Sequence, residues 1–279
     1  MQYSKIVNKS GSSVSLSMPY VSLATTLHDS TGWSVEPIKE TAETLNECYG
    51  SRLTIVTVGT KPEVVEALKN TGWTTVELRS RVGVEHITDS RRRVLQASLD
   101  KGSDYTHLVD MDRVLHWAIK YPEELRMVAA SIPDHDFMIF GRTRRAMDTH
   151  PRNQAETEAI ANKVFSLILG RDMDITAASR GISREAADTI LRHSRGRFFD
   201  SDSEWPTILH CLGYQISYAE VEGLEWETHL KRREMTLPDG RTLDSKEYYE
   251  ANPESWVYRL MIAHRIAEAA YRAQQIFSR

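Results

Sequence analysis

Two carboxylates lie one residue apart at the end of a short run that favours a β-strand. The run is Tyr105-Thr-His-Leu-Val-Asp110-Met-Asp112, and in an extended strand Asp110 and Asp112 point to the same side. Two hard oxygen ligands there can hold Mg²⁺ or Mn²⁺ and leave coordination positions open for phosphate oxygens and water. The pattern therefore indicates metal-assisted chemistry on a phosphorylated substrate, with an ordinary surface strand end as the alternative.

Composition limits the classes of protein to which the chain can belong. Its 279 residues, 41% of them hydrophobic, can bury the core of one large domain. The net charge of −4 gives no global basic field, so nucleic acid is not expected as a partner. Cys48 and Cys211 lie far apart, which argues against a disulfide framework. Neither a signal-peptide pattern nor a run long enough to span a bilayer is found, which predicts a cytoplasmic protein.

The first half of the chain alternates strands with helices. Such alternation predicts a mainly parallel sheet covered by helices on both faces, with ligands beyond the carboxyl ends of the strands. Asp110 and Asp112 fall at that edge. Strands are expected at 20–27, 52–58 and 73–78 before the run that ends in the two aspartates, and helices at about 36–49, 62–70 and 89–101, the last capped by Asp89.

The second half has a different pattern. A strand at 137–140 is followed by a helix at about 154–169, a helix that Ser183 caps, an acidic turn at 200–206 that opens a helix to Leu212, and a strand at 214–221. A last helix is expected from about Pro253 to Phe277. Its apolar stripe can dock on its own domain, pair with a second copy or lie on a membrane surface.

The order of these motifs resembles the GT-A fold glycosyltransferases of the nucleotide-diphospho-sugar transferase superfamily, and most of all the family 2-like group. Besides the D-x-D triplet, the resemblance is carried by Ser179-Arg180-Gly181 before a helix and by the acidic turn before Leu212-Gly213-Tyr214. It implies an α/β, Rossmann-like, mainly parallel sheet flanked by helices, with a C-terminal helical extension. The expected divisions are a leader at 1–17, a catalytic domain at 18–230 with a donor half at 18–113 and an acceptor half at 114–230, and a C-terminal loop and helix at 231–279.

The resemblance also implies a nucleotide-diphosphate sugar as the donor. Asp110 and Asp112 would hold the Mn²⁺ or Mg²⁺ ion that bridges the donor diphosphate, and His229 would be a further metal or phosphate ligand. A basic residue of the preceding helix, Arg91 or Arg92, would contact the donor. The other residues expected to bind the donor are Thr26, His28, Asp29, Asp110, Arg180 and Gly181.

The acidic turn of the family usually supplies the general base that acts on the acceptor hydroxyl. This implies Glu204, with Asp202 as the next choice. The alternative for Glu204 is an acid that interacts with the dipole of its helix. Guanidinium groups pair with phosphate or carboxylate, so an anionic acceptor is expected near the arginines that follow the 137–140 strand, and Trp205 could stack on a sugar ring. Those arginines are Arg142, Arg144 and Arg145.

Together these features predict a metal-dependent glycosyltransferase that moves a sugar from a nucleotide-diphosphate sugar to an acceptor hydroxyl or phosphate. One alternative is a nucleotide-sugar-binding protein without turnover. Another is a sugar nucleotidyltransferase, although the first strand lacks the Gly-rich basic loop that cradles a nucleoside triphosphate. A homodimer through the C-terminal helix is the alternative to docking of that helix on its own domain.

Overall fold

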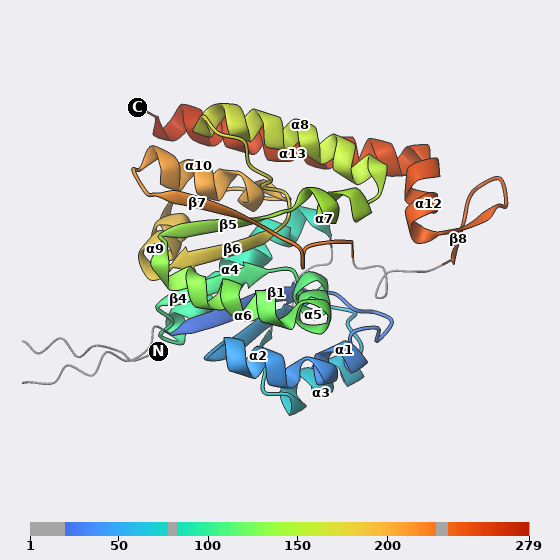
Figure 1. The fold of residues 1–279 in the computed structure, drawn as a ribbon, viewed down its shortest axis with the longest axis horizontal. Coiled ribbons are helices and arrows are strands. Elements are labelled where there is room, and N and C mark those ends of the chain that lie inside the picture. Colours follow the sequence, from blue (N-terminus) through green and yellow to red (C-terminus); the bar gives the residue numbers. More distant parts are fainter. Residues whose placement is uncertain (1–19, 78–82, 227–233, 279) are drawn as a thin grey trace, which may run out of the picture.

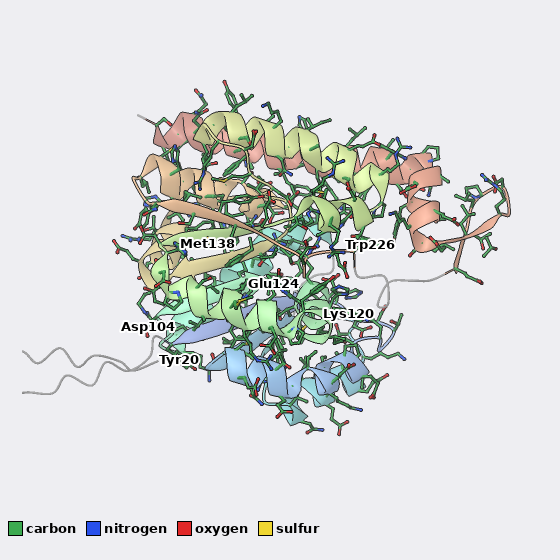
Figure 2. All side chains as sticks on the ribbon, in the orientation of Figure 1. Tyr20, Asp104, Lys120, Glu124, Met138 and Trp226 are labelled. Carbon is green, nitrogen blue, oxygen red and sulfur yellow. The ribbon has the colours of Figure 1, made fainter. Side chains whose placement is uncertain are left out.

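The computed structural model describes residues 20–77, 83–226 and 234–278. A seven-stranded sheet with the order β3-β2-β1-β4-β6-β5-β7 forms its centre (Figure 1). Tyr20, directly before the first strand, donates its backbone N–H to Asp104 at 2.9 Å (Figure 2). The strands are β1 (Val21–Leu27), β2 (Ser51–Val56), β3 (Thr74–Glu77), β4 (Tyr105–Val109), β5 (Phe137–Arg142), β6 (Ser179–Ser183) and β7 (Ile216–Val221).

The sheet is mainly parallel, as predicted, and β6 is the exception. This strand runs antiparallel to both of its neighbours, β4 and β5. The sequence pattern predicts that Ser179 to Ser183 belong to a segment that leads into a helix. Because Ser-Arg-Gly-Ile-Ser carries no alternation of apolar and polar residues, its strand conformation comes from the ladder hydrogen bonds that two flanking strands provide.

Helices cover both faces of the sheet, and the side chains of each strand alternate between two cores. On β1, for example, Leu23 belongs to one core and Ala24 to the other. The first core lies under α1 (Val35–Glu40), α2 (Ala42–Cys48), α3 (Pro62–Asn70), α5 (Met111–Lys120) and α6 (Pro122–Ser131). The second lies under α4 (Ile87–Asp100), α8 (Arg152–Leu169), α9 (Arg184–His193), α10 (Glu204–Cys211) and α13 (Pro253–Phe277).

Several boundaries differ from those expected. The helix predicted over 36–49 is two helices that meet at Thr41, whose Oγ1 donates to the carbonyl of Pro37 at 2.7 Å. Helices α5 and α6 were not expected. Asp89 lies in the first turn of α4, which His86 precedes as N-cap. The shorter elements are η1 (Val84–His86), η2 (Ile132–Asp134), α7 (Arg144–Thr149), η3 (Asp200–Asp202), β8 (Glu234–Thr236), β9 (Thr242–Asp244) and α12 (Ser245–Ala251).

The C-terminal helix α13 has the bounds that the sequence predicts, and it docks on its own chain. It lies along α8 and reaches α10 (Figure 1). Ile266 is buried there, and its carbonyl accepts a hydrogen bond from Ser203 Oγ at 2.5 Å. Other members of the apolar stripe, such as Val257 and Leu260, are exposed. In the described part of the chain no helix is both long and apolar enough to cross a bilayer.

Candidate active site

The D-x-D carboxylates lie where β4 gives way to a helix. β4 ends at Val109, so the prediction that Asp110 and Asp112 share one side of an extended strand is wrong. Asp110 is the N-cap of α5, with extended backbone angles (φ −67°, ψ 141°), and Asp112 lies in the first helical turn. The partial positive charge of a helix N-terminus favours carboxylates at these positions. Both aspartates therefore stay at the carboxyl edge of the sheet.

A cavity of about 370 Å³ opens at this edge, beyond β1, β2 and β4. We call it the strand-end cavity. Asp110 and Asp112 lie in its wall together with Thr26 and His28 from the end of β1. The His28 ring joins the loops after β1 and β2, because its Nδ1 lies 2.8 Å from Thr57 Oγ1. Further lining residues are Trp33, His86, Ser90, Arg91 and Phe199.

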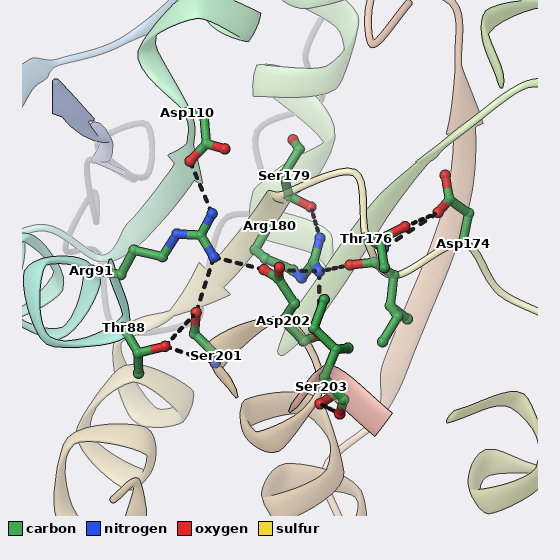
Figure 3. A network of polar contacts seen from close by, with 12 residues as sticks. Thr88, Arg91, Asp110, Asp174, Thr176, Ser179, Arg180, Ser201, Asp202 and Ser203 are labelled. Carbon is green, nitrogen blue, oxygen red and sulfur yellow. Dashed lines mark hydrogen bonds and ion pairs between the residues drawn. The ribbon is translucent and has the colours of Figure 1, made fainter. Parts of the chain in front are cut away.

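A buried arginine holds Asp110 from the interior side. Arg91 of α4 is 4% exposed, and its Nη2 donates to Asp110 Oδ1 at 2.9 Å. Its Nη1 donates to Asp202 Oδ1 at 2.7 Å and to Ser201 Oγ at 3.0 Å (Figure 3). Burial opposes the charge of this guanidinium, but the attraction of Asp202 and Asp110 is stronger and raises the pKa of Arg91. The network thus ties α4 and η3 to the first D-x-D carboxylate.

A second cavity, of about 180 Å³, adjoins the first and shares Arg91, Asp110, Asp112 and Phe199 with it. We call it the adjoining cavity. Its far wall comes from α8, α13 and the loop after β7. Arg259 of α13 donates to Gln154 Oε1 at 3.0 Å, and its other terminal nitrogen lies 3.7 Å from Glu158. The remaining polar or aromatic lining residues are Arg113, Thr176, Asp202 and Trp226.

The loop after β7 is held by α6, a helix that the sequence analysis missed. The two oxygens of Glu124 accept hydrogen bonds from the backbone of Glu222 at 2.9 Å and of Gly223 at 2.8 Å. A Cβ on Gly223 would lie 1.9 Å from the Trp117 ring, so only glycine fits against that ring. These contacts position the segment that leads to Trp226 (Figure 2). Trp226 lines the adjoining cavity.

Neither a protein-family model nor a curated protein matches the chain. Solved structures do. Glucosyl-3-phosphoglycerate synthase from Mycobacterium tuberculosis in complex with Mn²⁺, uridine diphosphate and phosphoglyceric acid superposes with a TM-score of 0.58 at 10% identity, over 91% of this chain and 78% of that chain. The same enzyme in complex with uridine diphosphate gives a TM-score of 0.53 at 12% identity, over 91% and 80%. The chain has the GT-A glycosyltransferase fold. The fold predicted from the order of motifs is thereby confirmed. At such low sequence identity, the structural similarity shows the fold and not the function.

Within this GT-A fold, two of the residues expected at the acceptor, Glu204 and Trp205, line neither the strand-end cavity nor the adjoining cavity. The buried Glu204 carboxylate accepts hydrogen bonds from Ser194 Oγ at 2.5 Å and from the backbone N–H groups of Arg195 at 3.2 Å and Gly196 at 3.1 Å. Trp205 is buried in the core, and its Nε1 donates to Ser194 Oγ at 3.0 Å. Both side chains therefore shape the loop after α9. Among the carboxylates of the acidic turn, Asp202 lines the adjoining cavity.

The three arginines expected to form an anion site after β5 do not converge. Arg142 is buried, and two carboxylates compensate its charge, Glu158 at 2.7 Å and Asp174 at 2.7 Å. Those carboxylates outweigh the effect of burial and raise the pKa of Arg142. Arg144 is exposed and pairs with Asp148 within α7. Arg145 pairs with Glu222 and Glu225. Each guanidinium group therefore pairs with carboxylates that lie outside the strand-end cavity.

Among the other residues expected at the donor, Asp29 and Arg92 organise loops. The buried Asp29 carboxylate accepts hydrogen bonds from Gly32 N at 2.7 Å and Ser34 N at 2.9 Å. Burial favours the neutral acid, but these hydrogen bonds are stronger in sum and lower the pKa of Asp29. Arg92 donates to the Gly196 carbonyl at 2.8 Å. None of these residues lines the strand-end cavity.

Arg180 and Gly181 lie within β6 and face the interior. Arg180 donates to the carbonyl oxygens of Ser179 and Ile175, and its Nη2 is 3.9 Å from Asp202 Oδ1 (Figure 3). Burial lowers the pKa of Arg180 to about 10. A Cβ on Gly181 would lie 2.9 Å from Ile132, so this glycine serves close packing. Both residues pack behind the wall of the site and line neither the strand-end cavity nor the adjoining cavity.

Asp110 and Asp112 fit a divalent cation as a partial ligand set. Their hard carboxylate oxygens suit Mg²⁺ or Mn²⁺ when phosphate oxygens and water complete the coordination. Over residues 20–77, 83–226 and 234–278, no cluster of three or more His, Cys, Asp or Glu side chains could hold a metal by itself. His229, the third ligand expected from the sequence, lies outside the described residues.

Proposed function

We propose that the protein is a metal-dependent glycosyltransferase that moves a sugar from a nucleotide-diphosphate sugar to an acceptor hydroxyl. The observation that carries this proposal is the position of Asp110 and Asp112 in the wall of the strand-end cavity, at the carboxyl edge of a GT-A sheet. In α/β sheets this edge is where ligands bind. A protein of the same fold, glucosyl-3-phosphoglycerate synthase, was solved with Mn²⁺, uridine-diphosphate-glucose and phosphoglyceric acid, which supports the same class of donor here.

The donor is proposed to occupy the strand-end cavity. Its nucleoside would lie against Thr26, His28 and Trp33, at the end of β1 and in the loop that follows it. Asp110 and Asp112 would bind the divalent ion, which supplies positive charge to neutralise the leaving diphosphate. Arg91 positions the Asp110 carboxylate through the 2.9 Å hydrogen bond and adds a second positive charge near the diphosphate.

The acceptor is proposed to enter the adjoining cavity. Arg113 and Arg259 lie in the wall of this cavity beside carboxylates such as Glu158, and we propose that these two arginines bind a carboxylate or phosphate group of the acceptor. Asp202, in preference to Glu204, is the proposed proton acceptor. Its Oδ1 is held by Arg91, whereas its Oδ2 accepts no hydrogen bond from the residues that the structure describes. That oxygen is available to the acceptor hydroxyl, as a general base requires.

Donor binding is the first test. A ligand that binds only the native state raises its melting temperature, so nucleoside diphosphates and their sugars should raise Tm in the presence of Mn²⁺ or Mg²⁺ and not with a chelator. Asp112→Asn should remove the metal-dependent part of the shift. Asp148→Asn is the matched control, because Asp148 is an exposed aspartate of α7 that pairs with Arg144 outside both cavities. No shift with any nucleotide and metal would refute the proposal.

Turnover is the second test. Incubation of a stabilising donor with phosphorylated and carboxylated alcohols should release the nucleoside diphosphate, and Asp202→Asn should lower the rate by about a hundredfold or more. A transferase that uses Asp202 as base inverts the anomeric centre, and a product of retained configuration would remove that role. Donor binding without release or transfer under any metal would favour the nucleotide-sugar-binding alternative.

A further inference from the structure

A third cavity, of about 400 Å³, lies between the segment after α9 and the C-terminal part of α13. We call it the helix-end cavity. It shares no lining residue with the strand-end cavity or the adjoining cavity. Its wall is rich in arginine side chains, namely Arg195, Arg197, Arg265 and Arg272, and also includes His193. The proposed transfer reaction assigns no role to any of them.

The carboxylates in this wall are already engaged. Glu204 accepts hydrogen bonds from backbone N–H groups, as described above. Asp200 pairs with Arg272 at 2.9 Å, and Glu268 pairs with Arg265 at 3.1 Å. Two arginines remain. Arg195 donates from Nη1 to the carbonyl of Ser194 at 2.7 Å, and within the described ranges neither Arg195 nor Arg197 forms an ion pair with a carboxylate. The cavity therefore has an excess of positive charge.

We propose that the helix-end cavity binds a small phosphorylated metabolite, whose phosphate is held by Arg195 and Arg197. Guanidinium groups bind phosphate through paired, charge-assisted hydrogen bonds. The volume is in the range of small-molecule sites, about 300 to 1,000 Å³. Phe198, Ile276 and Phe277 supply apolar wall for the organic part of the ligand. An apolar ligand would leave the two guanidinium groups without a partner.

The same segment connects this cavity to the proposed donor site. Phe198 lines the helix-end cavity, whereas its neighbour Phe199 lines the two other cavities. Phe198 has a left-handed backbone (φ 34°), a conformation that side chains other than glycine adopt only where their surroundings enforce it. Its carbonyl accepts the backbone N–H of Thr88 at 2.9 Å. Ser201 and Asp202, a few residues on, hold Arg91 and through it Asp110 (Figure 3).

A ligand that contacts Arg197 and Phe198 therefore acts on the segment that positions Arg91. Coupling of this kind requires two sites that bias one shared element, and the segment 197–202 is that element. We infer that occupancy of the helix-end cavity changes the affinity of the strand-end cavity for its ligand. This second step rests on the proposed function, whereas binding of the phosphorylated metabolite does not.

Calorimetric titration of the full chain with inorganic phosphate and with ribose 5-phosphate tests the binding. Both probes should bind, and the double variant R195Q/R197Q should weaken the affinity by about tenfold or more, because it removes two charge-assisted contacts. Arg192→Gln is the control, since Arg192 is an exposed arginine of α9 that does not line the cavity. It should change the affinity by less than about twofold. Equal affinity of the wild type and the double variant, or no binding of either probe, would overturn the proposal.

Hydrogen exchange locates the bound phosphate and tests the coupling. Amides of the segment 193–203 should exchange more slowly when phosphate is present, and so should those around Thr88 and Arg91, which are bonded to that segment. Protection only around the D-x-D triplet would place the phosphate in the strand-end cavity and refute the new site. Protection of 193–203 alone would refute the coupling. Neither result depends on whether a nucleotide sugar binds.

Discussion

At the residue scale, two carboxylates of one acidic turn have different environments. Asp202 faces the adjoining cavity and is tied to Arg91, whereas Glu204 is tied to backbone N–H groups after α9. They are two residues apart, at the change from η3 to α10. Neighbouring side chains in helical turns point in different directions, so sequence spacing alone did not separate a candidate base from a loop-forming acid.

Glu204→Gln is predicted to affect stability more than turnover. Glutamine keeps one oxygen that can accept hydrogen bonds but replaces the other by an NH₂ group. An NH₂ group is itself a donor, so it cannot accept hydrogen bonds from the N–H and O–H groups that now donate to the Glu204 carboxylate. We expect the free energy of unfolding to fall by about 1 to 3 kcal/mol in urea denaturation. Transfer by the folded variant should stay within about threefold of wild type. A folded Glu204→Gln protein without turnover would restore Glu204 as the base.

His107 is predicted to make the protein sensitive to acid. It is fully buried between Tyr49 Oη at 2.6 Å and Ser179 Oγ at 2.9 Å, and burial lowers the pKa of His107 to about 3. The unfolded chain, with a histidine pKa of about 6.5, takes up this proton first as the pH falls. The stability that neutral His107 contributes is therefore complete above about pH 6.5 and is lost between about pH 6.5 and 3, by up to about 1.4 kcal/mol per pH unit.

Urea denaturation at a series of pH values checks this prediction. The free energy of unfolding should fall less steeply between about pH 6.5 and 4 in His107→Gln than in the wild type. His210→Gln, at an exposed position of α10, should keep the wild-type slope. Parallel curves for His107→Gln and the wild type would show that His107 is not the group that titrates.

At the element scale, α13 shows what a helical pattern predicts well. Asn252 caps the helix by accepting the N–H of Glu254 at 3.0 Å, Pro253 occupies the first turn, and the stripe has the period of a helix. The pattern did not reveal which part of the stripe is buried. That depends on where α8 and α10 lie, because those helices cover only one side of α13.

Two substitutions on α13 separate the docked side from the exposed side. Ile266 is 2% exposed and Val257 is 67% exposed. Ile266→Ala should lower the free energy of unfolding by about 2 to 5 kcal/mol, because it leaves a cavity against α8 and α10. Val257→Ala should change it by no more than about 0.5 kcal/mol. Similar losses for both variants would indicate that Val257 is covered in solution.

At the scale of the whole molecule, α8 and α13 lie side by side and form an outer layer (Figure 1). Ile160 and Leu167 on α8 are exposed, as are Leu260 and Tyr271 on α13. Exposed apolar side chains that gather on one layer favour association. The homodimer that the sequence analysis named as an alternative stays a prediction, and this layer is the surface on which we expect it to form.

Sedimentation equilibrium tests the dimer. We expect a mass of twice 31.9 kDa at micromolar concentration, and about the mass of one chain for the double variant Ile160→Asp/Leu260→Asp, because a charge is costly to bury in an apolar interface. Glu36→Ala/Lys39→Ala, an exposed pair on α1 at the other face of the sheet, is the control and should leave the mass unchanged. A single-chain mass for the wild type at every concentration would contradict the prediction.

The sequence by itself determined the α/β class, the carboxyl-edge position of Asp110 and Asp112 and the bounds of α13, because these follow from local periodicity, capping and strand alternation. Only the tertiary structure decided that β6 is a strand, since neighbouring strands supply its hydrogen bonds. It also decided that Arg142 and Trp205 are buried and that Arg259 reaches the adjoining cavity. Residues far apart in the chain make these sites, and the compensation of a buried charge depends on partners that no local pattern identifies.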